Sequence, residues 1–189
     1  MEKTAVQKLA GVLKVLVTVT LVCNLVALLL VPGMSLMKGP EELLALTPYE
    51  NPLEVPLRVG LVFVLSWGWV WTAGVYEVVL ALFLLFCGIC TAVILWQGRR
   101  VLGTILTGAP FRAENGVSLR RAAVCCFLIA AAALARVVWG LFYYGSVAPL
   151  LTYNALFVPI FILGGLLCLV MSALFRQAAE LKAENDLTI

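Results

Sequence analysis

The 189-residue chain contains no histidine, and charged residues make up only 12% of it, against 63% hydrophobic residues. Histidine is a common ligand of haem iron and other metals, and its side chain transfers protons near neutral pH. Its absence argues against a haem protein and weakens any metal or general-base proposal. We therefore expect no enzyme activity, with no catalytic, cofactor-binding or metal-binding residues and no cofactor.

Long apolar runs dominate the sequence instead. A run of about 20 residues can cross a roughly 30 Å hydrocarbon core as a helix. Continuous rather than alternating apolar residues favour helices over strands. The sequence therefore predicts an all-α membrane protein, a four-transmembrane-helix bundle forming a single domain over residues 1–189, with spans at about 10–31, 75–97, 119–143 and 154–175.

The first apolar run resembles a secretory signal in following several lysines. It extends from Val15 to Val31, however, and ends in Pro32-Gly33 without a small-residue cleavage site. A signal peptide has a shorter apolar core of about 7–15 residues. We expect this run to be retained as the first span.

Residues 57–73 form a further apolar segment that leads directly into the second span. A fifth span here would place Arg99 and Arg100 outside the cell, against the positive-inside rule. We therefore expect residues 32–74 to form one long extracytoplasmic loop, with residues 57–73 along the outer membrane interface.

Tryptophans at every second position, Trp67, Trp69 and Trp71, characterise this segment. Such rings concentrate at headgroup depth. Their spacing suits an extended segment better than a helix. A strand, a re-entrant stretch and an interfacial helix all remain open.

The distribution of arginine predicts the orientation. The connection after the second span contains a single acidic residue, Glu114, and five arginines: Arg99, Arg100, Arg112, Arg120 and Arg121. Such loops stay in the cytoplasm. Both termini, including a tail at 176–189, are then predicted to be cytoplasmic in a multi-pass protein of the bacterial inner (plasma) membrane.

Cys87 and Cys90 have the C-x-x-C spacing of disulfide oxidoreductases. Both lie in the predicted second span, and the other four cysteines also lie inside spans. Apolar surroundings leave a thiol unreactive. We interpret the cysteines as small packing residues.

Charged residues inside spans are a stronger indication of function, because their burial in a membrane is unfavourable. Arg136 lies well inside the third span and Glu77 just inside the second, both toward the predicted outer side. We expect them to approach each other or to share an outer cavity with Asn154. A snorkelling arginine and a solvated glutamate are the structural alternative.

The connection between the second and third spans has apolar residues at helical spacing over 101–106. This pattern predicts a short amphipathic helix along the inner leaflet, ended by Gly108 to Pro110. Asn115 or Ser118 is suited to cap the following helix. The arginines suit anionic lipid headgroups, and so small a patch does not predict direct nucleic-acid binding.

The C-terminal tail is polar. Residues 176–184 are expected to extend the fourth span as a helix that ends near Asn185. The remaining Asp186, Leu187, Thr188 and Ile189 are expected to be extended, with Leu187 and Ile189 on one face. Such a segment suits docking to a partner, and a frayed end is the alternative.

The segments APFRAENGVSLRRA and ELKAENDLTI, with four spans in this order, resemble a bacterial membrane-protein family. It is catalogued as domain of unknown function 2975 and includes the YoaS-like proteins. The most specific parts of the resemblance are Pro110-Phe111 with Asn115 and the terminus from Asp186 to Ile189. The resemblance implies a cytosolic helix-turn-helix regulator as partner and no catalytic residues.

Two functions follow from these features. The first is a non-enzymatic membrane sensor or anchor for the cytosolic regulator. The alternative is small-molecule or peptide handling, as a transport accessory or immunity-type protein, through an outer cavity near Glu77 and Arg136. The lipid bilayer is a partner in both cases, and the sequence leaves homo-oligomerisation open.

Overall fold

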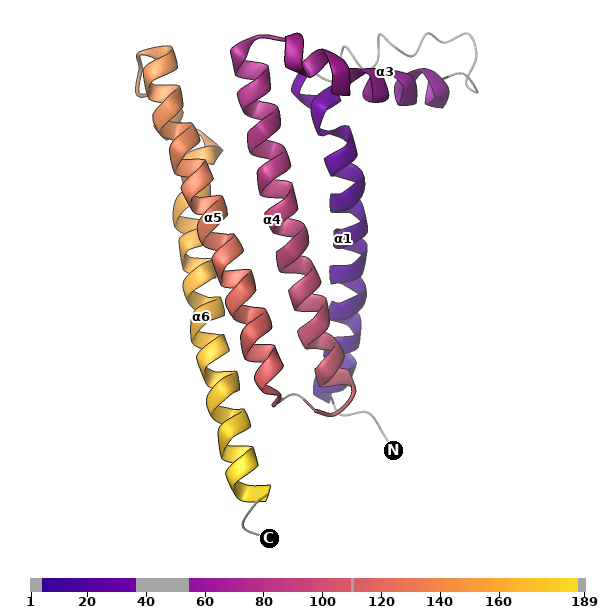
Figure 1. The fold of residues 1–189 in the computed structure, drawn as a ribbon, viewed down its shortest axis with the longest axis vertical. Coiled ribbons are helices and arrows are strands. Elements are labelled where there is room, and N and C mark those ends of the chain that lie inside the picture. The colour runs from indigo at the N-terminus through magenta and orange to yellow at the C-terminus, as the bar shows by residue number, and fades with distance from the viewer. Residues whose placement is uncertain (1–4, 37–54, 110, 187–189) are drawn as a thin grey trace. The chain divides into compact units, whose positions relative to one another are not determined.

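The structure, a computed structural model, describes residues 5–36, 55–109 and 111–186, and these residues form helices and short connections without a strand. The elements are α1 (Ala5–Leu36), α3 (Val55–Trp69), the 3-10 turn η1 (Val70–Thr72), α4 (Val75–Leu106), α5 (Ala113–Tyr144), the 3-10 turn η2 (Ala148–Leu151) and α6 (Tyr153–Asp186) (Figure 1). Within the described ranges, α1, α4, α5 and α6 are long and apolar enough to cross a membrane. The all-helical class predicted from the apolar runs is confirmed, and these four helices have the length and composition expected of a multi-pass membrane protein.

Contacts divide the chain into two compact units. The first consists of residues 1–24 and 89–189, and the second of residues 25–88. Helices α1 and α4 each contribute one part to each unit.

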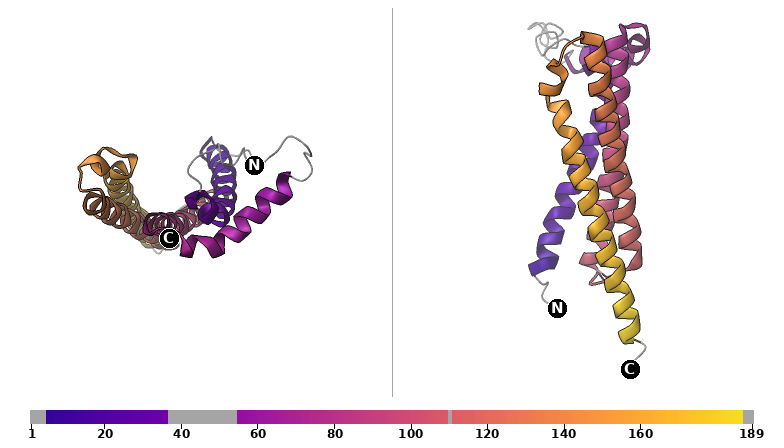
Figure 2. Two further views of the ribbon diagram at one scale, coloured as in Figure 1. Left: turned by 90° about the horizontal axis from the view of Figure 1, so that it is seen from above. Right: turned by 90° about the vertical axis from the view of Figure 1, so that its left-hand side faces the viewer.

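In the first unit, α5 and α6 are antiparallel neighbours (Figures 1 and 2). Gly145 ends α5 in the left-handed conformation, with φ of 60°, and η2 completes the reversal. A Cβ added to Gly165 would lie 2.9 Å from ring carbons of Phe127, so the glycine lets α6 approach α5 closely.

In the second unit, α3 lies across the ends of α1 and α4 (Figure 1). The indole Nε1 of Trp67 donates a 3.0 Å hydrogen bond to the Leu29 carbonyl of α1. The ring of Phe63 occupies the space that a Cβ on Gly33 would need. The core of this second unit is formed by Val31, Val70 and Ala81.

The preference for an extended segment at residues 57–73 is wrong, because α3 and η1 are helical. The expected single long loop at 32–74 is also wrong. Helix α1 continues through Pro32 and Gly33 to Leu36, and α3 with η1 occupies residues 55–72. Residues 37–54 of that predicted loop lie outside the described residues. Gly33 acts here as a contact site for Phe63 rather than as a helix end.

The separate amphipathic helix predicted at 101–106 is the last part of α4, which runs without interruption from Val75 to Leu106. Gly98 does not end the helix, because a single interior glycine weakens a helix by only about 1 kcal/mol. The predicted stop is confirmed at Gly108, whose φ of 75° ends the helical path.

Candidate functional site

A buried hydrogen bond joins α5 to α6 at the end where the chain passes from α4 into α5. The Ser172 hydroxyl of α6 donates a 2.7 Å hydrogen bond to the backbone carbonyl of Gly116 in α5. Ser172 is 5% exposed, and Gly116 is buried. Interhelical hydrogen bonds of this kind stabilise helix pairs in a membrane environment.

Gly116 also allows the two helices to approach closely. A Cβ at this position would lie 2.7 Å from the Arg176 Cγ and 3.0 Å from the Ser172 carbonyl oxygen. The aliphatic part of Arg176 therefore packs directly on the first turn of α5. Any larger residue at position 116 would push α6 away.

Two further contacts involve the loop before α5 and helix α4. The rings of Phe111 and Phe175 lie 6.5 Å apart in a tilted arrangement. The Asn115 amide donates a 2.7 Å hydrogen bond to the Thr104 hydroxyl of α4. Asn115 is 2% exposed, so this polar contact is inside the protein.

The prediction that Asn115 or Ser118 caps α5 is wrong. The residue before the helix is Arg112, in an extended conformation and without a side-chain cap. Asn115 instead lies inside the helix and binds α4, because the α4–α5 turn brings Thr104 within reach of its amide. We call Thr104, Phe111, Asn115, Gly116 and Ser172 the junction.

Helix α6 continues beyond the junction, past the first residues of α5 (Figures 1 and 2). It extends ten residues after Arg176 to Asp186, and residues 180–185 are exposed. The predicted helical tail is confirmed. The predicted extended stub begins too early, since Asp186 is still helical. Leu187, Thr188 and Ile189 lie outside the described residues.

The second polar feature lies near the opposite end of α5. Arg136, eight residues before the last residue of α5, donates a 3.3 Å hydrogen bond from Nη1 to the Asn154 Oδ1 at the start of α6. Both side chains are half-buried. The structure thus brings together two of the three residues that the sequence suggests for the outer polar site.

Glu77 belongs to the unit of residues 25–88. Its carboxylate folds over the first turn of α4, with Oε2 2.5 Å from the position of a Cβ on Gly74. A carboxylate at a helix N-terminus is favourable because it faces the positive end of the helix dipole. The coupling of Glu77 to Arg136 stays a prediction.

The cysteines of the described residues are not joined in disulfides, and Cys90 and Cys126 are buried. Among residues 5–36, 55–109 and 111–186, no group of three or more Cys, Asp or Glu side chains could hold a metal ion. The polar groups described above are suited to hydrogen bonding and helix packing.

Sequence reasoning missed most of the junction. It noted Phe111 and Asn115 but gave no role to Thr104, Gly116 or Ser172. A signal was present, because Ser172 is a hydroxyl residue inside an otherwise apolar span, where such residues commonly bond to a neighbouring helix.

Comparison with known proteins gives one result. The family model described as "Protein of unknown function (DUF2975)" matches residues 45–189, which include the whole junction and the Arg136–Asn154 pair. Neither the curated proteins nor the solved structures contain a match to the chain. The model covers well over half of the sequence, and the protein therefore belongs to the DUF2975 family of proteins of unknown function.

Proposed function

We propose that the protein is a non-enzymatic membrane anchor that holds a cytosolic protein on the helical extension of α6. The observation that carries this proposal is the continuation of α6 beyond the junction. Helix α6 has 34 residues, whereas about 20 cross the hydrocarbon core of a bilayer. The surplus is polar and exposed over residues 180–185, which suits contact with a soluble protein.

The junction supports a sensing role for the same extension. Ser172 and Arg176 fix α6 against Gly116 immediately before the extension begins. A change in the packing of α5 against α6 within the membrane would therefore change the position of the extension. A signal can reach a bound partner in this way without any chemical step.

The proposed partner is the cytosolic helix-turn-helix regulator that the family resemblance implies. The positive-inside rule supports a cytoplasmic position, because the arginines of the α4–α5 connection lie at the same end of the first unit as the extension. Leu187 and Ile189 would add apolar contacts beyond Asp186.

Co-purification tests this proposal. The regulator is produced with the full chain, with a chain that ends after Arg176, and with a chain whose residues 177–189 are replaced by an Ala-Glu-Lys helix of equal length. The replacement is the matched control, because it keeps a helix and its charge while removing the native side chains. We expect the full chain alone to retain the regulator. Retention by the replacement chain would contradict specific docking on the extension.

A second candidate function rests on the Arg136–Asn154 hydrogen bond. An arginine paired with an amide within apolar helices is typical of sites for polar ligands. In this alternative the protein handles a small molecule or peptide as a transport accessory or immunity-type protein. A phenotype that is lost with Arg136→Gln and kept with the replaced extension would favour it over the anchor.

A further inference from the structure

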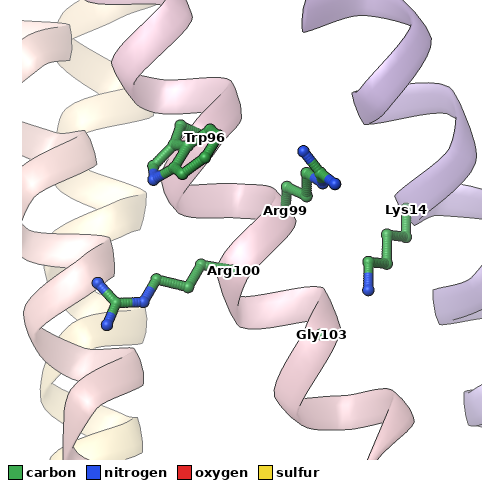
Figure 3. A pocket seen from close by; sticks show the side chains of 5 residues that line it. All are labelled: Lys14, Trp96, Arg99, Arg100 and Gly103. Carbon is green, nitrogen blue, oxygen red and sulfur yellow. The ribbon is translucent and has the colours of Figure 1, made fainter.

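A cavity of about 380 Å³ lies between the first half of α1 and the last third of α4, both within the first unit (Figure 3). It is lined by three cations, one aromatic residue and one glycine: Lys14, Arg99, Arg100, Trp96 and Gly103. These lining residues include no carboxylate. The cavity thus has room for a small anion, and the residues that line it carry positive charge with no negative charge among them.

Three glycines lie where the two segments are in ordinary van der Waals reach of each other. A Cβ on Gly11 would lie 3.8 Å from the Leu106 Cδ2, and one on Gly108 would lie 3.9 Å from the Gln7 Nε2. A Cβ on Gly103 would lie 3.7 Å from the Lys14 Nζ. From Gln7 through Gly11 to Lys14 the residue number rises along α1, while the number of the contacted residue falls from 108 through 106 to 103. The two segments are therefore antiparallel.

The register of these contacts places the Lys14 ammonium beside the α4 backbone at Gly103. A side chain at position 103 would fill part of the cavity next to the ammonium. The glycine therefore keeps the lysine accessible to a ligand rather than covered by a neighbour.

Two of the cations point toward the same space. Figure 3 shows Lys14 and Arg99 extending from α1 and α4 toward the gap between them, whereas Arg100 extends to the opposite side of α4. The Arg99 Cζ lies 5.8 Å from the centroid of the Trp96 ring, within the range of a cation–π contact. This contact orients the guanidinium before a ligand arrives.

The depth of the cavity suits the headgroup region. Arg99 is seven residues before the last residue of α4, or about 10 Å along the helix. Tryptophan together with lysine and arginine is typical of the boundary between headgroups and acyl chains. A guanidinium binds phosphate oxygens in a bidentate manner, and an ammonium adds a further charged donor.

We propose that this cavity binds an anionic phosphate group, with Arg99 and Lys14 as the two cationic donors and Gly103 as the residue that leaves room for it. The headgroup of an anionic phospholipid and a free phosphate ion share this chemistry. The volume accommodates a phosphate group with several water molecules, each of which occupies about 30 Å³. The site is separate from the extension proposed to hold a partner.

Binding to purified protein tests the proposal. Phosphatidylglycerol and phosphatidylcholine with identical acyl chains, and inorganic phosphate, are each added to the protein in a neutral detergent. Bound lipid is counted by native mass spectrometry, and the melting temperature is followed for all three additions. We expect phosphatidylglycerol to bind and to raise the melting temperature, with phosphatidylcholine weaker by about tenfold or more. Protection by inorganic phosphate alone would support the same site with a soluble ligand.

Variants locate the site. Lys14→Gln and Arg99→Gln should each weaken phosphatidylglycerol binding by about tenfold, and Lys14→Arg should retain it. Gly103→Leu should block binding by filling the cavity. Arg121→Gln, which removes an exposed arginine of α5 outside the cavity, is the matched control and should bind as the unaltered protein does. Equal weakening by Arg121→Gln, or no preference for any phosphate-bearing anion, would overturn the proposal.

Discussion

The Ser172 hydroxyl of α6 is bonded at 2.7 Å to the Gly116 carbonyl of α5, immediately before α6 leaves the junction. An interhelical bond at this point restrains the angle at which the extension departs. The same glycine receives the aliphatic part of Arg176. One side-chain bond and one close contact therefore connect the membrane helices to the segment proposed to hold a partner.

Replacement of Ser172 by alanine tests the bond. We expect the free energy of unfolding to fall by about 1 kcal/mol, because a buried interhelical hydrogen bond is lost. Thermal unfolding in detergent gives the measurement. Ser146→Ala, in the exposed α5–η2 connection, is the matched control and should have little effect. Equal melting temperatures for the two variants would show that the bond does not stabilise the junction.

A side chain at position 116 should separate α5 from α6. Gly116→Val places carbon atoms where Arg176 and the Ser172 carbonyl lie, and such overpacking destabilises by about 1–3 kcal/mol. We also expect weaker capture of the regulator. Gly98→Ala is the control, because nothing lies within 4 Å of its added Cβ. A normal melting temperature for Gly116→Val would contradict the close approach.

Gln97 of α4 is 7% exposed, and its Oε1 has no hydrogen-bond partner among the described residues. A buried acceptor without a partner is destabilising by about 1–3 kcal/mol. Gln97→Leu should therefore be neutral or raise the melting temperature. Gln177→Leu, at an exposed position of α6, corrects for the general effect of the substitution. A marked loss of stability in Gln97→Leu alone would mean that the amide makes a stabilising contact.

Coupling between Glu77 and Arg136 is the prediction that the sequence makes for the outer polar site. If the pair is desolvated, Glu77→Gln or Arg136→Gln alone should destabilise the protein more than both together, because one charge then stays unpaired. A double-mutant cycle on thermal unfolding measures the coupling energy. Additive losses would leave Arg136 with Asn154 and Glu77 with the α4 N-terminus as two independent features.

The four long apolar helices could be predicted because each is a long apolar run, and length with composition is sufficient to identify a helix that can cross a membrane. Helix ends were less predictable. Pro32 and Gly33 are ordinary stop signals, yet α1 passes through them because Phe63 of α3 packs onto Gly33. That contact joins segments thirty residues apart, and no local pattern contains it.

The preference for an extended conformation at residues 57–73 was wrong for a related reason. Alternate spacing of Trp67, Trp69 and Trp71 is typical of a strand only when one face is buried. All three tryptophans are exposed, although Trp67 also donates a hydrogen bond to the Leu29 carbonyl, so the alternation does not reflect a buried face. A helix at a membrane interface satisfies its own backbone groups, which an isolated strand cannot do.

The junction was predictable in part. Asn115 stood out as a polar residue near a helix start, where capping is the common role. Its amide instead reaches Thr104, because Gly108 turns the chain back toward α4. The partners of Asn115 and Ser172 depend on how three helices pack, and the sequence alone does not supply that packing.

The anchor proposal depends most directly on the side of the membrane on which the α6 extension lies. Single cysteines are introduced at Glu184, in the extension, and at Val147, between α5 and α6, on a cysteine-free background. Intact cells are treated with a membrane-impermeant thiol reagent, and permeabilised cells give the total label. We predict that Val147→Cys is labelled in intact cells and Glu184→Cys only after permeabilisation. Labelling of Glu184→Cys from outside would contradict a cytoplasmic extension and the anchor function with it.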